Sequence, residues 1–397
     1  MNLSPFNALV ATLLLPLFVS SAPTTTTIEN TPAPRSNARS ELPRLVIYFQ
    51  TTHDDLGNPI SMLPLIHEKH IALTHLIVCS LHINEDQDIR LNDYSPYDPH
   101  FYTLWNETVI MQRAGVKVTG MIGGADPGSF DTGTLDSTDD ATFELYYAQL
   151  AQVIRTYDLQ GMDLDVEQYM SQAGIERLVQ RLNADFGEDF IITLAPVATA
   201  LENSANLSGF NYTALAQASH LAASSTTGSA TANKTTGAAA QGAEMIHFLN
   251  AQFYSGFGTM NSPTDFQNVV AAGWDPKFIV AGQLTSPLNG AGYTDASTLN
   301  ETVVQLVAEY GIIGGIMGWE YFDSEPGGTD EPWEWAQEMT AILRPGDSLA
   351  LTITDETATT LSTAWNHSVI MNGSESTATE QQHAAAARVD YFAMVNA

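Results

Sequence analysis

The chain has 397 residues, 44% of them hydrophobic, which is enough to bury the core of one large domain such as an α/β barrel, or of two smaller ones. Its formal net charge of −31 argues against nucleic acid or an anionic membrane as a partner, because their phosphates repel a strongly acidic protein. The same charge suits a neutral or cationic substrate.

The amino-terminal residues have the pattern of a secretory signal. An apolar run over 9–19, broken by Pro16, precedes the small residues Ser20, Ser21 and Ala22 and is too short to span a bilayer. We therefore predict a signal peptide over 1–22 and, over 23–42, a disordered linker or pro-segment rich in Thr, Pro, Ser and Asn. Several Asn-x-Ser/Thr sequons support a secreted, extracellular glycoprotein: Asn106, Asn206, Asn211, Asn233, Asn300, Asn366 and Asn372.

After the linker, short apolar segments alternate with amphipathic ones for some three hundred residues. The apolar segments predict strands over 45–49, 76–79, 116–122, 162–166, 191–195, 248–254, 278–281 and 313–319. The amphipathic segments predict helices over 101–114, 142–157, 175–186, 212–220, 299–310 and 333–343. Asp139 or Thr138 would cap the second helix and Ser171 the third. This alternation without hairpin signals predicts an α/β fold, a TIM (β/α)8 barrel, with an open doubly wound sheet as the alternative.

The barrel accounts for most of the chain. We predict a single catalytic domain over 43–345, interrupted by a low-complexity loop of Ala, Ser, Thr and Gly over 222–242. A Ser/Thr/Ala-rich tail over 346–397 has too little apolar pattern for a second catalytic domain.

The strand over 162–166 is unusual because acidic residues occupy alternate positions along it. Asp163, Asp165 and Glu167 would share one face, whereas the intervening Met, Leu and Val would share the other. Crowded buried carboxylates are costly unless protons, hydrogen bonds or an ion relieve them, which is typical of a functional site. We predict acid–base chemistry, with Glu167 as general acid, Asp165 orienting a polar group and Asp163 sharing a proton or hydrogen bond with Asp165. A Mg²⁺ or Ca²⁺ site is the alternative, although apolar packing around the strand leaves little room for further ligands.

Other strand ends should meet Glu167 at the carboxyl-terminal rim of the barrel. Gly124 ends the third predicted strand, Gln252 and Tyr254 end the sixth, and Trp319 ends the eighth. The indole of Trp319 offers a flat apolar surface on which a pyranose could stack, although core packing would also explain it. The phenol of Tyr254 could reach an acetamide carbonyl, although Tyr254 could likewise belong to the core.

Three further features have simpler interpretations. His67 and His70 lack a third metal ligand at a suitable spacing, so a solvated helix end is the better interpretation. His53 follows the first predicted strand and could contact substrate, although a charged loop tip is favoured. Cys79 is the only cysteine, lies in an apolar strand and is expected to be an inert core thiol.

Read as a D-G-x-D-x-D-x-E pattern, the acidic strand resembles the signature of glycoside hydrolase family 18, the chitinase family. The glycine pair, the Gln252-Phe253-Tyr254 motif and the run 315–320 resemble that family at the corresponding strands. The stretches 48–53, which begins with Tyr48, and 252–258 resemble the secreted fungal endo-β-N-acetylglucosaminidases of the family. Gln160 and Met121 depart from it, standing where the family usually has Asp and Ser. Residues 283–313 leave no room for the α+β insertion of some chitinases.

The resemblance implies hydrolysis of GlcNAc-β1,4-GlcNAc bonds by a retaining, substrate-assisted mechanism. In it Glu167 protonates the leaving oxygen, Asp165 and Tyr254 hold the substrate's acetamide, and Asp163 supports Asp165. We also predict that Trp319, Gln252, Tyr48 and Gly124 bind substrate, without cofactor or metal. The expected partner of this monomer is a carbohydrate, with N-glycan cores favoured, chitin or chito-oligosaccharides as the alternative, and an inactive lectin less favoured because Glu167 and Asp165 are intact.

Overall fold

A computed structural model of the chain describes residues 42–83, 88–226 and 245–346. The predicted signal peptide, almost all of the predicted linker and tail, and most of the low-complexity segment lie outside these ranges. Among the helices that the described ranges contain, none is both long and apolar enough to cross a membrane.

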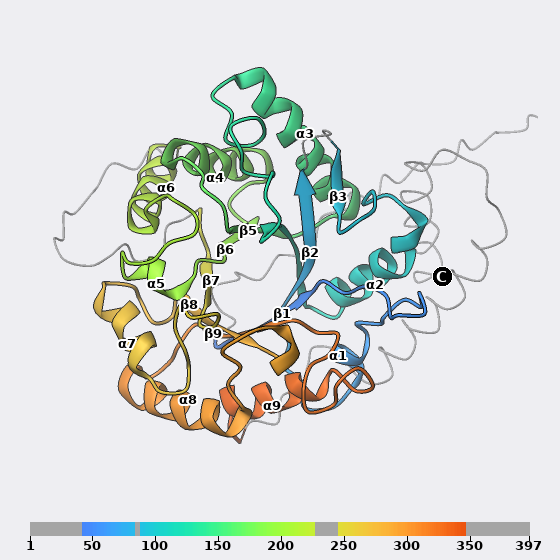
Figure 1. Ribbon diagram of the computed structural model, residues 1–397, viewed down its shortest axis with the longest axis vertical. Coiled ribbons are helices and arrows are strands. Elements are labelled where there is room, and N and C mark those ends of the chain that lie inside the picture. Colours follow the sequence, from blue (N-terminus) through green and yellow to red (C-terminus); the bar gives the residue numbers. More distant parts are fainter. Residues whose placement is uncertain (1–41, 84–87, 227–244, 347–397) are drawn as a thin grey trace, which may run out of the picture. The chain divides into compact units, whose positions relative to one another are not determined.

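Eight parallel strands close into a barrel, as predicted (Figure 1). Around it the strands follow the order β1, β9, β8, β7, β6, β5, β4, β2, and β1 pairs in parallel with both β9 and β2. This double pairing closes the sheet and excludes the open doubly wound alternative. The strands are β1 (Arg44–Phe49), β2 (His75–Ile83), β4 (Lys117–Gly124), β5 (Gly161–Val166), β6 (Ile191–Leu194), β7 (Phe248–Gln252), β8 (Ile279–Leu284) and β9 (Gly315–Trp319).

Helices surround the strands (Figure 1). They are α1 (Pro64–His67), α2 (Tyr102–Arg113), α3 (Asp140–Tyr157), α4 (Gln172–Phe186), α5 (Ala198–Leu201), α6 (Tyr212–Thr226), α7 (Thr264–Ala271), α8 (Ala296–Tyr310) and α9 (Glu334–Leu343), with 3-10 turns η2 (Pro99–Phe101) and η3 (Pro287–Asn289). The predicted caps are confirmed, since Asp139 accepts from the Thr142 amide and Ser171 from the Gly174 amide. The helix α6 continues six residues beyond the predicted end at 220, because Leu and Ala in that stretch favour a helix.

The described structure contains a hairpin that the sequence pattern did not indicate. A short strand, β3 (Ile89–Leu91), runs antiparallel to the end of β2, with Leu81 opposite Leu91 and Ile83 opposite Ile89. Only three residues long, β3 gives a weak alternation signal, although the polar residues at 84–88 are typical of a turn. The strand β3 lies beside the end of β2, near α3 (Figure 1).

The barrel has two apolar cores, one inside the strands and one between strands and helices. Nine buried residues form the inner cluster, on which Trp319 packs: Val46, Tyr48, Ile77, Cys79, Met121, Ile191, Phe248, Val280 and Met317. Met162, Leu164 and Val166 belong to the outer cluster, so β5 alternates between its faces as predicted. Cys79 lies in the inner core as expected, where burial raises the pKa of its thiol.

The connection from β8 to β9 is short. All of residues 285–314 are described, and they contain only η3 and α8 as regular elements, which agrees with a barrel lacking an α+β insertion.

A buried carboxyl group holds α2 against the segment that follows β1. Glu107 is 0% exposed, and its two oxygens accept hydrogen bonds from the Ser61 hydroxyl (2.8 Å) and the Met62 amide (2.7 Å). Burial outweighs these donors and raises the pKa of Glu107 to about 7.

We predict that Glu107 makes the protein less stable as the pH rises. Because the folded pKa lies above the ordinary value of 4.5, the protonated group stabilises the fold fully below pH 4.5, and this contribution is lost as the pH rises through about 7. The shift corresponds to roughly 3 kcal/mol. In the variant Glu107→Gln, thermal unfolding midpoints at pH 5 and pH 8 should lie closer together than in the wild type.

The exposed Glu188, substituted in the same way, is the control and should leave the wild-type difference between the two midpoints unchanged. An unchanged difference in Glu107→Gln would show that the Glu107 carboxyl does not ionise in this range.

Candidate active site

Asp163 and Asp165 lie on β5 and Glu167 follows it directly, in order of increasing exposure. Asp163 is 0% and Asp165 4% exposed, and both point into the barrel. Glu167 follows the last strand residue and is partly exposed. The predicted order of depth is therefore confirmed, and of the three only Glu167 combines the strand end with access to solvent.

Asp163 is held by three donors from three other strands, β1, β6 and β7. Its Oδ2 accepts from the Tyr48 hydroxyl (2.6 Å), and its Oδ1 accepts from Thr193 Oγ1 (2.5 Å) and Asn250 Nδ2 (3.0 Å). Burial raises the pKa of Asp163, and the three donors oppose this shift. The expected hydrogen bond to Asp165 is not among those that the described residues make.

Asp165 has far less support than Asp163. Its hydrogen-bond donor among the described residues is Gln252 Nε2, at a long 3.3 Å from Oδ1. Burial raises the pKa of Asp165 well above its ordinary value, and the charges of Glu167 and Asp163 raise it further. Asp165 therefore tends to keep a proton where an exposed aspartate would lose it.

The Gln252 side chain joins Asp165 to Glu167. Its Nε2 donates to Glu167 Oε1 at 3.0 Å as well as to Asp165, and a third contact, to the Ala195 carbonyl oxygen at 3.0 Å, fixes the amide. Gln252 is 6% exposed. It was predicted to bind substrate, and the structure brings it to the carboxyl groups themselves.

Tyr254, two residues further on, reaches the same group of carboxyls. It is 8% exposed, and its hydroxyl makes no hydrogen bond within the described parts of the chain. Burial raises the pKa of Tyr254 well above its ordinary value, and Asp165, Glu167 and Asp163 add to the shift in that order. The phenol therefore stays protonated and retains its donor hydrogen.

Trp319 and Tyr48 form adjacent layers under the rim. The partly exposed indole of Trp319 lies above the inner core, with its centroid 5.4 Å from the Tyr48 ring at a tilt of 58°. Tyr48 is 1% exposed, and its hydroxyl is bonded to Asp163. Its hydroxyl is therefore directed into the protein and supports a carboxyl group, while its substrate-binding role stays a prediction.

Glycines at the end of β4 leave space beside Asp165. Gly123 has φ +107°, and a Cβ there would lie 2.1 Å from the Asp165 carbonyl oxygen. Gly124 has φ +93°, and a Cβ there would lie 3.9 Å from Asp165 Oδ2, so a larger side chain would extend toward that carboxyl. Met121 packs in the inner cluster opposite Asp163 in the strand register.

A further carboxyl group, which belongs to the run 315–320 but was not among the predicted site residues, secures the end of β1. Glu320 is 8% exposed and accepts hydrogen bonds from the amides of Gln50 (3.0 Å) and Thr51 (2.9 Å) and from the Thr51 hydroxyl (2.5 Å). Burial raises the pKa of Glu320 against the effect of these donors. Because Glu320 follows Trp319, it joins the indole to the segment after β1.

Two other residues discussed in the sequence, Gln160 and His67, lie away from the carboxyl groups. Gln160 accepts from the Val118 amide (3.0 Å) at the opposite end of β5 from the carboxyl groups. His67 ends α1 with its side chain about half exposed, which agrees with a solvated helix end. In the described ranges no group of three or more His, Cys, Asp or Glu side chains is arranged to hold a metal ion.

Known proteins resemble this chain both in sequence and in fold. Residues 44–283 match the model of glycosyl hydrolases family 18. A fungal endo-β-N-acetylglucosaminidase of that family is 61% identical, with a TM-score of 0.70 over 77% of this chain and 100% of that chain. A chitinase from Aspergillus fumigatus is 42% identical, with a TM-score of 0.63 over 75% of this chain and 98% of that one.

A chitinase of the same family from Pseudoalteromonas aurantia, 19% identical with a TM-score of 0.56 over 76% of this chain and 100% of that one, supports the fold alone. A search of the curated proteins gave no match. The family match covers more than half of the chain and includes the acidic strand and the Gln252-Phe253-Tyr254 segment. The chain therefore belongs to glycosyl hydrolases family 18 and is a glycoside hydrolase.

Proposed function

We propose that the chain is a secreted endo-β-N-acetylglucosaminidase that cleaves the GlcNAc-β1,4-GlcNAc bond of N-glycan cores. The observation that carries this proposal is the Gln252 amide, which donates to both Asp165 and Glu167 and so joins a buried carboxyl to a solvent-accessible one. The similarity to the fungal enzyme, at 61% identity, supports the choice of substrate. The leader pattern and the sequons support secretion.

Glu167 is the proposed general acid. It lies just past the end of β5, is partly exposed, and has its carboxyl fixed through Oε1 by Gln252. Its proton would go to the glycosidic oxygen as the bond between that oxygen and C1 breaks. In the second step the same group, now a carboxylate, would take a proton from the attacking water.

The nucleophile would come from the substrate. Asp165 is 4% exposed and tends to stay protonated, and a protonated carboxyl group is a poor nucleophile. The 2-acetamido oxygen of the sugar would instead bond to C1 and give an oxazolinium ion, while a carboxyl oxygen of Asp165 accepts from the acetamide N–H. The unpartnered Tyr254 hydroxyl would donate to the acetamide oxygen. Water then adds at C1, the bond between C1 and the acetamide oxygen breaks so that the oxazolinium ring opens, and the configuration at C1 is retained.

A second substrate class is favoured by a separate observation. The chitinase from Aspergillus fumigatus is 42% identical to this chain, and chitin contains the same GlcNAc-β1,4-GlcNAc bond. The proposed chemistry applies to both substrates, so the preference for one of them must depend on rim residues outside the catalytic site. A non-catalytic lectin is disfavoured because Glu167 and Asp165 are both present and paired through Gln252.

We predict that the protein removes high-mannose glycans from a glycoprotein and leaves one GlcNAc on each Asn. The reaction would appear as a shift on a denaturing gel and, by mass spectrometry, as a single residual GlcNAc. Glu167→Gln should lower the rate by at least about 10²-fold, because general acid and base assistance are both lost.

The variant Glu188→Gln, which changes an exposed carboxyl outside the site, should retain full activity. Rapid hydrolysis of colloidal chitin without any deglycosylation would show that chitin, and not the N-glycan, is the preferred substrate. Unimpaired turnover by Glu167→Gln would refute the acid assignment.

We also predict that Tyr48 acts as a positioning residue through Asp163. Tyr48→Phe removes the donor at 2.6 Å from Asp163 Oδ2 and leaves a buried carboxyl with one fewer partner. Since that donor lowers the pKa of Asp163, its loss should raise this pKa and move the pH profile of kcat upward. We expect kcat to fall about tenfold, equivalent to ~1.4 kcal/mol, with little change in KM.

Tyr321→Phe provides a matched control, because Tyr321 is equally buried and its hydroxyl has no hydrogen-bond partner in the described structure. It should leave both kcat and the pH profile unchanged. If the two variants behave alike, the Tyr48 hydroxyl has no special part in positioning Asp163.

A further inference from the structure

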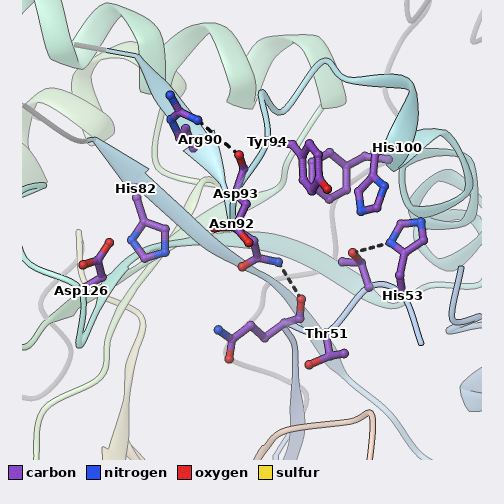
Figure 2. Close-up of a pocket in the computed structure, with 12 residues that line it drawn as sticks. Thr51, His53, His82, Arg90, Asn92, Asp93, Tyr94, His100 and Asp126 are labelled. Atoms are coloured by element: carbon purple, nitrogen blue, oxygen red, sulfur yellow. Dashed lines mark hydrogen bonds between the residues drawn. The ribbon is translucent and has the colours of Figure 1, made fainter. Parts of the chain in front are cut away.

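A pocket of about 570 Å³ opens on the rim beside the carboxyl ends of β1 and β2 (Figure 2). Its lining comes from the segment 50–53 after β1, from the β2–β3 hairpin, from the segments 92–94 and 100–101, and from Asp126 after β4. None of the three carboxyl groups of the active site lines it. It is therefore a separate recess on the same face of the barrel.

Hydrogen bonds attach the floor of this pocket to the active-site strands. The Asn92 side chain donates to the Gln50 carbonyl oxygen (2.9 Å) and accepts from the Ser80 amide (3.1 Å), so it joins the ends of β1 and β2. Gln50 and Thr51 in turn donate to Glu320, the residue after Trp319. The pocket is thus preformed and adjoins the strand end that carries the indole.

One wall of the pocket is a stack of three flat rings (Figure 2). The centroids of His53 and His100 are 3.6 Å apart, and those of His100 and Tyr94 are 4.3 Å apart. Tyr94 is 46% exposed, so part of its ring remains available to a ligand. Burial, together with the charge of His100, lowers the pKa of His53, which favours its neutral form. Such a surface suits the C–H faces of a sugar ring.

The opposite side of the pocket is polar (Figure 2). His82 has a buried Nδ1 without a hydrogen-bond partner in the described structure, and the exposed Asp126 lies close to it. Arg90 donates to the carbonyl oxygen of Asp93 (3.3 Å). Carboxylates, an amide and hydroxyls around one recess can bind the vicinal hydroxyls of a neutral hexose, whereas the carboxylates of Asp93 and Asp126 repel an anionic ligand.

We propose that this pocket binds a hexose branch of the glycan whose GlcNAc-GlcNAc bond is cleaved at Glu167. The inference rests on the proposed action on N-glycans. A linear GlcNAc chain has no side arm to fill a recess beside its path, whereas a high-mannose glycan branches beyond its two core GlcNAc residues. Tyr94 and Asp126 are the specificity residues of this site, on its aromatic and polar sides.

The test compares two glycopeptides, one with the complete high-mannose glycan and one trimmed by mannosidases to a single mannose on the GlcNAc-GlcNAc core. Tyr94→Ala should lower kcat/KM for the complete glycan about tenfold more than for the trimmed one, because it removes the ring on which the branch stacks. Asp126→Ala, which changes an exposed residue on the opposite wall, should also lower kcat/KM for the complete glycan more than for the trimmed one. This second variant keeps the test valid if the protein does not fold without Tyr94.

Tyr102→Ala is the matched control, because Tyr102 is a similarly exposed tyrosine (41%) outside the pocket, and it should leave the ratio unchanged. If both pocket variants leave the ratio of the two kcat/KM values unchanged, the branch site is wrong. Cleavage of either glycopeptide by the wild type would still support the proposed function in that case. Failure of the wild type to cleave both glycopeptides would overturn the proposed function and, with it, the branch site.

Discussion

Asp163 and Asp165 project from one face of β5 and are almost inaccessible to solvent, and the organisation of the site follows from this crowding. Two ionised carboxylates there would be strongly unfavourable, because burial removes their hydration and brings like charges together. Asp163 is relieved by three hydrogen-bond donors from β1, β6 and β7, whereas Asp165 has one long contact from Gln252. The electrostatic strain is thereby concentrated on Asp165, whose pKa is raised well above its ordinary value.

This division of the carboxyl groups is the basis for the proposal that only one of them exchanges protons with the substrate. Asp163 is fixed in the interior, and Asp165 retains a proton and is fitted to orient a polar group. Glu167, held by the same Gln252 amide but beyond the strand end, is partly exposed to solvent. The inner core of the barrel supports this arrangement, because Tyr48 belongs to it and bonds Asp163 directly.

The sequence was sufficient to predict the barrel, the face and depth of the acidic residues, and most element positions, since these depend on local periodicity and on the rule that strand ends form the site. It could not identify Thr193 and Asn250 as partners of Asp163, because both come from other strands and their register emerges only when the barrel closes. The same reason applies to the hydrogen bond between the Tyr48 hydroxyl and Asp163. The hairpin with β3, and the pocket beside it, were missed because three residues give almost no periodic signal.

In the proposed mechanism the substrate's acetamide, and no side chain of the protein, attacks C1 while Glu167 supplies and later removes the proton. The most direct measurement compares the rate of cleavage of a GlcNAc-β1,4-GlcNAc substrate with that of an analogue in which a hydroxyl replaces the 2-acetamido group of the sugar whose C1 is attacked. The proposed mechanism predicts that the analogue is not cleaved, because it lacks the attacking oxygen. Cleavage of the analogue at a rate close to that of the natural substrate would require a nucleophile from the protein and would contradict the mechanism.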